Sequence, residues 1–344
     1  MRLRYVKAGS RGYRRERRGR GFSYVDDHGV RLADAAELGR IKELVIPPAW
    51  SDVWVSAYPN AHLQAAGTDA AGRRQYLYHE RFRAEQDAAK HEHVLDVARA
   101  LPALRERVES DLHRRGLDRL RVLAAGARLL DLGFFRIGGE AYARENQTYG
   151  LTTLLRSHIA CSKGRVDITY VGKSGKEWDR AVVDPPTCAT LTALRRRKGT
   201  DERLFVYWDR KAWHEVRAAE LNAYLNDAAG VEISAKDFRT WHATVLAAVA
   251  LAVSTQAVDA VRTRRTAVSR AVKEVAHYMG NTPTVCRASY INPRVIELYE
   301  EGITIAPHLT DLGAEAEWGL PATHGAVEQD VIRLLTRPDA QRKR

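Results

Sequence analysis

Four residues that could carry out one reaction are spread along this chain of 344 residues: Arg136, Lys173, Arg239 and Tyr290. The phenol of tyrosine, whose pKa is about 10, becomes a nucleophile when nearby cations stabilise its anion. Arginine forks suit two non-bridging oxygens of a phosphate, and a lysine can protonate a leaving alkoxide. These residue types are typical of phosphoryl transfer without a metal ion. Their separations in sequence do not by themselves bring the four together, so the grouping is a hypothesis.

Tyr290 stands near the junction of two predicted helices. Apolar residues recur at helical spacing before Gly280, and glycine ends a helix readily because it adopts the left-handed conformation without strain. The stretch N-T-P (281–283) favours the start of a second helix, and Pro293 predicts a boundary just after the tyrosine. A tyrosine at such a boundary can present its hydroxyl to a ligand. Taken alone, this stretch favours a simpler interpretation, in which the ring is half-buried between two helices.

The two arginines and the lysine lie on three further elements. Arg136 follows a predicted buried helix over 117–133 and precedes two glycines, where backbone can approach another molecule closely. Lys173 lies at the tip of a β-hairpin predicted over 165–183. Arg239 lies in the first turn of a helix predicted over 238–255, which a serine-to-aspartate capping motif at 234–237 precedes.

The elements that hold these residues are predicted to form an α+β protein. Two domains are expected, because 344 residues exceed one ordinary core. Residues 1–20 contain nine lysines or arginines and one acid, which is typical of a solvated, flexible basic arm. Alternating strands predict a small β-rich N-terminal domain over 21–85. Residues 86–344 are predicted to form a mainly α-helical domain that carries the β-hairpin and has one of its helices over 211–228.

One strand of the β-rich domain is a candidate binding surface. In G-R-R-Q-Y-L-Y-H (72–79), Arg73 and Gln75 share one face, and Tyr76 and Tyr78 share the other. Such side chains can reach both phosphates and base edges in a major groove. A strand with one solvated face and aromatic packing on the other fits the same residues, so both interpretations stay open.

The overall charge indicates the kind of partner. The formal net charge of +12 favours a polyanion, by attraction and by release of counterions. The longest apolar run, nine residues over 245–253, is far shorter than a membrane helix. Three scattered cysteines suit neither a disulfide framework nor a zinc site, and they fit a reducing cytoplasm. ATP binding through G-K-S (172–174) is excluded, because the glycine required five residues earlier is Asp167.

The chain resembles the type IB DNA topoisomerases of the small poxvirus and bacterial kind. The resemblance extends from F-S-Y-V-D (22–26) to Y-I-N-P-R (290–294), most of the chain. Any one of the matching motifs is weak, whereas eight in the family's order are very specific. In order they are V-I-P-P-A-W, H-L-Q-A-A-G, G-R-R-Q-Y-L-Y-H, R-I-G-G-E-A-Y, N-Q-T-Y-G-L-T-T-L, V-G-K-S-G-K, K-D-F-R-T-W-H-A and S-Y-I-N-P-R.

The resemblance implies a tyrosine recombinase/topoisomerase IB-like catalytic domain and an N-terminal domain that binds DNA. It implies relaxation of supercoiled duplex DNA by transient cleavage of one strand, strand rotation and religation, with no ATP, metal or other cofactor. Tyr290 would attack the scissile phosphate and form a 3′-phosphotyrosyl link. Arg136 and Arg239 would hold the phosphate, and Lys173 would act as the general acid on the 5′ oxygen.

Further positions match the family's motifs. Lys236 corresponds to a lysine that supports the active site, and Tyr142 to a residue that contacts a phosphate. Gln75, Tyr76 and Tyr78 correspond to positions that contact DNA in the poxvirus enzymes. One position departs from the pattern: Asn281 stands where the family usually has histidine. A carboxamide can donate a hydrogen bond to a phosphate oxygen, but it carries no positive charge.

Two other functions use similar residues. Tyrosine recombinases share the chemistry and the catalytic fold, but they usually place histidine three residues before the second arginine, where this chain has Lys236. A non-enzymatic DNA-binding protein of the nucleoid would use the basic surface without needing Tyr290. We expect a cytoplasmic, nucleoid-associated monomer that clamps duplex DNA between its two domains.

Overall fold

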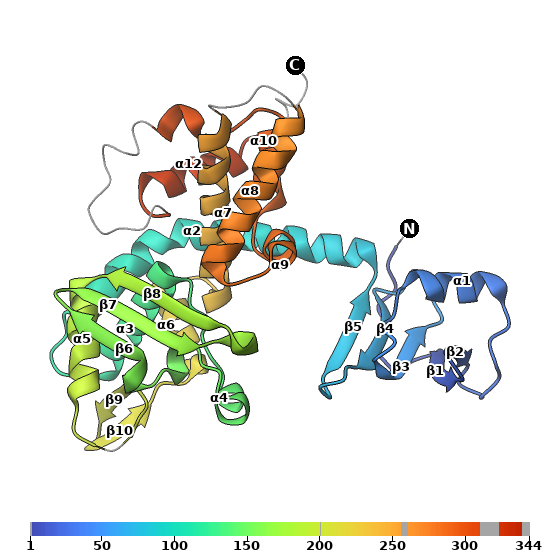
Figure 1. The fold of residues 1–344 in the computed structure, drawn as a ribbon, viewed down its shortest axis with the longest axis horizontal. Coiled ribbons are helices and arrows are strands. Elements are labelled where there is room, and N and C mark those ends of the chain that lie inside the picture. Colours follow the sequence, from blue (N-terminus) through green and yellow to red (C-terminus); the bar gives the residue numbers. More distant parts are fainter. Residues whose placement is uncertain (1, 200, 256–260, 310–322, 339–344) are drawn as a thin grey trace. The chain divides into compact units, whose positions relative to one another are not determined.

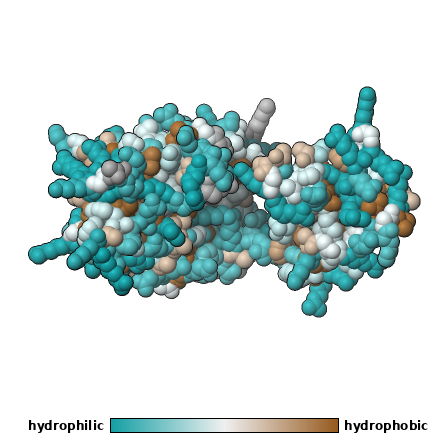
Figure 2. All heavy atoms as spheres, turned by 90° about the horizontal axis from the view of Figure 1, so that it is seen from below, coloured by the Kyte–Doolittle hydropathy of each residue, from teal (hydrophilic) through white to brown (hydrophobic). Residues whose placement is uncertain are grey.

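The computed structural model describes residues 2–199, 201–255, 261–309 and 323–338. The chain divides into two compact units, Met1–Glu92 and His93–Arg344 (Figure 1). In the view of Figure 2 the visible surface of both units is largely hydrophilic, with hydrophobic side chains in small scattered patches. Among the described residues, no helix is both long and apolar enough to cross a membrane.

The first unit is a five-stranded antiparallel sheet with the strand order β2-β1-β3-β4-β5. Helix α1 (Ala35–Glu43) begins at Asp34, whose side chain accepts from the backbone N–H groups of Ala36 and Glu37. A small core of Ile41, Val53, Val55 and Ala65 lies between this helix and the sheet. The strands are β1 (Gly12–Arg18), β2 (Gly21–Val25), β3 (Ser51–Ser56), β4 (Leu63–Thr68) and β5 (Arg74–Tyr78).

The prediction of a free basic arm over residues 1–20 is wrong for β1, which lies between β2 and β3 in the sheet. Its side chains alternate, so Tyr13 packs against the core while Arg14 is exposed. Arg15 donates to the carbonyl of Trp50 at 2.6 Å, and its guanidinium lies 4.1 Å from the centre of the Phe22 ring. A strand rich in arginine is accommodated here because its half-buried arginine, Arg15, finds both a backbone acceptor and an aromatic face.

The two compact units divide after Glu92, within α2 (Glu80–Leu112). The boundary predicted at 85/86 falls inside the same helix. Helix α3 (Arg119–Gly133) is almost entirely buried, as its sequence predicted. A three-stranded antiparallel sheet follows: β6 (Ile159–Ser162), β7 (Arg165–Val171) and β8 (Glu177–Val183). The predicted hairpin over 165–183 is β7 and β8, and its turn is a short 3-10 helix over Lys173–Gly175.

The prediction of one helix over 211–228 is wrong at its start. Strands β9 (Val206–Asp209) and β10 (Ala212–Glu215) form a hairpin, and helix α6 (Ala218–Ala229) begins only after it. Arg210 and Lys211 both have positive φ, as the two central residues of such a hairpin turn require. Trp208 and Trp213 are paired across the strands, with ring centroids 5.1 Å apart. Cross-strand packing therefore overrides the helical propensity of this stretch.

The remaining elements surround a single large core and confirm a mainly helical catalytic fold. Figure 1 shows α7 and α8 lying side by side, with α9 following α8. The helices are α4 (Glu140–Asn146), α5 (Pro185–Arg196), α7 (Ala235–Thr255), α8 (Val261–Met279), α9 (Pro283–Ser289), α10 (Pro293–Glu300) and α12 (Ala326–Leu335).

Candidate active site

Tyr290 lies at the C-terminal end of α9, where the helix stops and α10 has not begun. Pro283 starts α9, and Asn292 caps α10 by accepting from the N–H of Arg294 at 3.0 Å. The hydroxyl of Thr244 on α7 lies 3.3 Å from the Tyr290 carbonyl oxygen and accepts from the N–H of Asn292 at 3.1 Å. The backbone at the tyrosine and just after it is therefore fixed to α7, while the Tyr290 ring is half-buried.

Arg239 is the most buried charged residue near this tyrosine, with 2% of its surface exposed. Its guanidinium donates to the carbonyl of Phe134, at the end of α3, and to that of Met279 at 3.0 Å, at the end of α8. The guanidinium carbon lies 5.2 Å from the centre of the Tyr290 ring. One arginine thus joins three segments that are remote in sequence and lies beside the phenol.

Arg136 reaches the same region through Asn281. Its Nη2 donates to the side-chain oxygen of Asn281 at 2.7 Å. The segment after Arg136 makes a close backbone contact, because a Cβ added to Gly150 would lie only 2.4 Å from Cα of Gly138. The double glycine after Arg136 therefore allows the chain to approach its own backbone.

Asn281 follows Gly280, which ends α8 with φ of +61° as predicted. Asn281 is not the cap of α9: that role belongs to Thr282, whose side chain accepts from the N–H of Val285. The amide nitrogen of the Asn281 side chain is buried and has no acceptor among the described residues. Since its oxygen is engaged by Arg136, the free group is a donor, which suits an anion.

The charges around Tyr290 favour its phenolate. Burial alone would raise the pKa of Tyr290, but the positive charges of Arg239 and Arg136, with the hydrogen bonds they can give to the phenolate, lower it below its ordinary value. Burial, and then repulsion from Arg136, lower the pKa of Arg239 to about 10, which leaves it protonated at neutral pH. The arrangement can therefore stabilise both a phenolate and a bound phosphate.

The two predicted lysines, Lys173 and Lys236, are exposed, and neither is bonded to Tyr290 among the described residues. Lys173 begins the turn between β7 and β8, and Lys236 lies in the first turn of α7, one turn before Arg239. Within the described residues, no hydrogen bond or ion pair joins either lysine to Tyr290. The capping motif before α7 is confirmed, since Asp237 accepts from the N–H of Ser234 at 2.8 Å.

The predicted binding strand is β5, and its two faces differ. Tyr76 and Tyr78 are 46% and 39% exposed and their rings stack at 6.2 Å. Gln75, on the opposite face, is half-buried and donates to Asp69 at 2.8 Å, so its amide is already engaged within the protein. Arg73 is exposed and precedes the strand. The side chain of Tyr142, a residue of α4, lies outside the described part of the structure.

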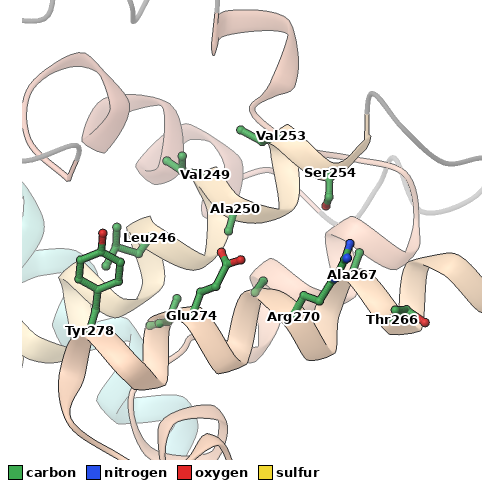
Figure 3. A pocket seen from close by; sticks show the side chains of 12 residues that line it. Leu246, Val249, Ala250, Val253, Ser254, Thr266, Ala267, Arg270, Glu274 and Tyr278 are labelled. Atoms are coloured by element: carbon green, nitrogen blue, oxygen red, sulfur yellow. The ribbon is translucent and has the colours of Figure 1, made fainter.

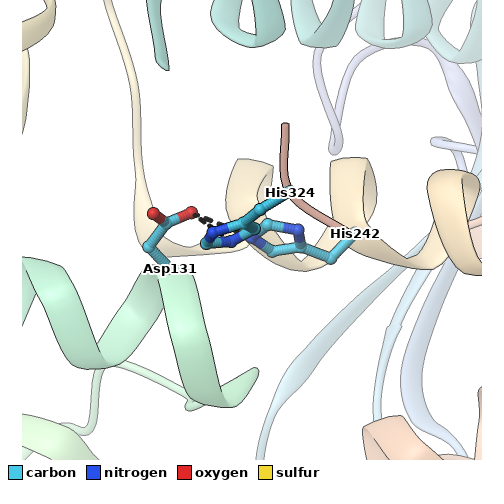
Figure 4. Close-up of side chains that lie close together, drawn as sticks. All are labelled: Asp131, His242 and His324. Carbon is cyan, nitrogen blue, oxygen red and sulfur yellow. Dashed lines mark hydrogen bonds and ion pairs between the residues drawn. The ribbon is translucent and has the colours of Figure 1, made fainter. Parts of the chain in front are cut away.

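One cluster of possible metal ligands was not foreseen from the sequence: Asp131, His242 and His324 (Figure 4). Both imidazoles point to one oxygen of Asp131, at 3.1 and 3.3 Å. Arg105 also donates to both oxygens of this carboxylate, at 2.8 and 3.0 Å. Burial would raise the pKa of Asp131, but His324 and Arg105 hold it well below its usual range. Because Arg105 already occupies both oxygens of this carboxylate, we interpret this cluster as an internal ion pair that joins α2, α3 and α7 to the segment before α12.

A groove of about 660 Å³ lies between α7 and α8 (Figure 3). Leu246, Val249 and Val253 line it from one helix, and Arg270 and Glu274 from the other. In the described part of the chain, none of the predicted site residues lines this groove. It is therefore separate from the tyrosine and arginine group.

Two family models match different parts of this chain. Residues 79–307 match the family model described as eukaryotic DNA topoisomerase I, catalytic core, and residues 21–69 match that of the bacterial DNA topoisomerase IB N-terminal domain. The chain is 29% identical over 297 residues to DNA topoisomerase 1B of Acanthamoeba polyphaga mimivirus, covering 84% of this chain and 88% of the viral protein.

Poxvirus proteins are more distant relatives. The chain is 24% identical over 264 residues to DNA topoisomerase 1 of rabbit fibroma virus, which covers 75% of this chain and 80% of that protein. It is 21% identical over 238 residues to DNA topoisomerase 1B of vaccinia virus strain Copenhagen, which covers 68% of this chain and 72% of that protein. The two family models together match parts of both units.

Proposed function

Because this chain belongs to the type IB DNA topoisomerases and is an enzyme of that kind, we propose that it relaxes supercoiled duplex DNA through a 3′-phosphotyrosyl intermediate at Tyr290. Strand rotation about the intact strand follows cleavage, and religation regenerates the phenol. The observation that carries the proposal is the phenol of Tyr290 beside two arginines that lower its pKa.

In the cleavage step the Tyr290 phenol loses its proton to water, its oxygen forms a bond to phosphorus, and the bond from phosphorus to the 5′ oxygen breaks. Arg136 and Arg239 stabilise the negative charge that develops on the non-bridging oxygens. Lys173 gives a proton to the departing 5′ oxygen, and Lys236 supports the site from the start of α7. Religation is the reverse, with the 5′ hydroxyl as the nucleophile.

The DNA contacts outside the site are proposed from charge and exposure. The exposed tyrosines of β5, Tyr76 and Tyr78, and the exposed Arg73 can approach a phosphate backbone or a groove. Gln75 reaches DNA only if it leaves Asp69, so we expect a smaller contribution from it. We further propose that the protein acts as a monomer on the nucleoid, with both units on the DNA and Tyr142 on a phosphate.

Relaxation without metal or ATP is the direct test of this function. Protein treated with EDTA should relax both positively and negatively supercoiled plasmid at close to the untreated rate, because the charges that stabilise the phosphate belong to side chains. Gel electrophoresis of plasmid topoisomers measures the rate. Activity that is lost completely in EDTA and restored by a divalent cation would contradict the metal-free mechanism.

Two observations separate this function from its alternatives. A protein that only binds DNA leaves none covalently attached after denaturant, whereas both enzyme classes do. A tyrosine recombinase needs partner sites, whereas a topoisomerase relaxes a plasmid that has none. Covalent trapping and relaxation of such a plasmid together identify the topoisomerase.

The role of Asn281 gives a graded prediction. We expect Asn281→Ala to slow single-turnover cleavage about fivefold, because the loss of one neutral hydrogen bond is worth about 1 kcal/mol. Asn281→His should remain active, since an imidazole can donate from a similar position. Asn281→Asp should be slower than Asn281→Ala, because it puts a negative charge beside the phosphate. Cleavage by Asn281→Asp at the wild-type rate would exclude contact with the phosphate.

A further inference from the structure

Two side chains of β8, Trp178 and Arg180, dock the lysine-bearing hairpin on the turn between α8 and α9. Trp178 is 9% exposed, and a Cβ added to Gly280 would lie 2.4 Å from its Cζ3 atom, so the indole lies directly on this glycine. Arg180 donates from Nη2 to the carbonyl of Tyr278 at 2.6 Å. Its guanidinium also covers the Trp178 ring, 4.8 Å from the centroid. Gly280, at the start of the turn, thus receives a flat apolar contact, and the last turn of α8 receives a directed hydrogen bond.

The same tryptophan supports the base of the lysine turn. A Cβ added to Gly172, the residue before Lys173, would lie 4.0 Å from the Trp178 Cβ and 3.6 Å from the Tyr170 ring. The Trp178 and Tyr170 rings are 6.5 Å apart, and both adjoin Phe135. Backbone hydrogen bonds close the turn itself, with the N–H of Gly172 donating to the carbonyl of Lys176 at 2.7 Å.

Trp178 therefore lies beside the base of one functional segment, paired with Tyr170 across the hairpin, and packs on the start of another. On one side is Gly172, next to Lys173, and on the other is Gly280, next to Asn281, which Arg136 contacts. From these contacts we propose that Trp178 and Arg180 are positioning residues, which fix the lysine turn relative to the arginine and tyrosine group. The inference rests on the proposed role of Lys173 as proton donor.

The physical need for such support follows from the exposure of Lys173. A lysine at the tip of a turn has a long, flexible side chain, so the position of its backbone decides which oxygen its ammonium can reach. A displacement of about 1 Å can cost about 100-fold in rate. An indole has only two side-chain torsions, and here Gly280, which has no side chain, lets the ring approach the backbone closely.

Single-turnover cleavage of two suicide substrates tests the inference. One substrate has the normal 5′ oxygen at the scissile bond, and the other has a 5′-bridging sulfur, which needs little protonation as it leaves. We expect Trp178→Ala to slow the oxygen substrate about 30-fold, and the sulfur substrate by less than about threefold. Adding Trp178→Ala to Lys173→Ala should slow the oxygen substrate little further, since the displaced proton donor is already absent.

Trp208→Ala is the matched control, because Trp208 lies on the exposed β9–β10 hairpin. This variant should cleave both substrates at the wild-type rate. Lys173→Ala on the same two substrates tests the proposed proton donor separately. If sulfur does not rescue Lys173→Ala, that role fails and this inference fails with it. The positioning role alone is overturned if sulfur rescues Lys173→Ala and Trp178→Ala is slowed equally on both substrates. It is also overturned if sulfur rescues Lys173→Ala and Trp178→Ala is slowed on neither substrate.

Arg180→Met provides a second variant in case Trp178→Ala does not fold. It keeps an unbranched side chain over the indole and removes the hydrogen bond to Tyr278. We expect a loss of about fivefold on the oxygen substrate and the same rescue by sulfur. A wild-type rate for Arg180→Met on the oxygen substrate contradicts its share in positioning the turn.

Discussion

Tyr290→Phe should leave no detectable covalent complex with DNA and should lower relaxation to less than about 10⁻⁴ of the wild-type rate. The substitution removes only the oxygen that forms the bond to phosphorus. The backbone contacts that place the ring, through the Thr244 hydroxyl, are unchanged. The arginines beside the phenol should still bind the phosphate, so non-covalent affinity for DNA should stay close to that of the wild type.

The measurement combines covalent trapping after denaturant with a binding assay on the same duplex. Tyr207→Phe is the matched control, since it removes a phenol oxygen from the β9–β10 hairpin, where it contacts Glu220. This control should relax plasmid at the wild-type rate. A covalent complex formed by Tyr290→Phe would assign the nucleophile elsewhere, and Tyr170, buried near both arginines, would be the first alternative.

Arg239→Ala should slow single-turnover cleavage about 10³-fold and move its pH dependence upward. Burial raises the pKa of Tyr290, and Arg239 is the largest of the opposing influences. Without this arginine the pKa rises, so less phenolate is present at neutral pH and the rate keeps increasing with pH over a higher range than in the wild type. The rate loss should therefore be largest at neutral pH.

Arg239→Lys separates charge from geometry. It keeps a cation near Tyr290 but loses the fork that donates to the carbonyls of Phe134 and Met279. We expect a slow enzyme whose pH profile lies closer to that of the wild type. Arg210→Ala, at the exposed tip of the β9–β10 hairpin, removes the same net charge as Arg239→Ala. It should change neither the cleavage rate nor its pH dependence. An unchanged pH profile for Arg239→Ala, with its melting temperature preserved, contradicts the proposed effect on the phenol.

The sequence was sufficient for the elements whose signals are local. The glycine that ends α8, the proline that starts α9, the capping motif before α7 and the β7–β8 hairpin all follow from preferences within a few residues. The order of eight motifs along the chain also indicates the family without any geometry. The α+β class followed from the change in periodicity near residue 80.

Only the tertiary structure decided the features that depend on partners remote in sequence. Strand β1 enters the sheet because Arg15 finds Trp50 and Phe22, and a run of arginines gives no sign of those partners. The cluster of Asp131, His242 and His324, with Arg105 bound to its carboxylate, likewise joins segments far apart in the chain. From the sequence Asn281 could contact a phosphate or cap α9, and in the structure Thr282 holds that cap.

The same distinction applies to the candidate site. Residue types and motifs indicated a tyrosine, two arginines and a lysine, but no spacing in the chain fixes their distances. Arg239 lies beside Tyr290 because its guanidinium is held by two carbonyls, one at the end of α3 and one at the end of α8. Local propensity selects the elements, whereas burial and long-range hydrogen bonds determine which of their side chains meet.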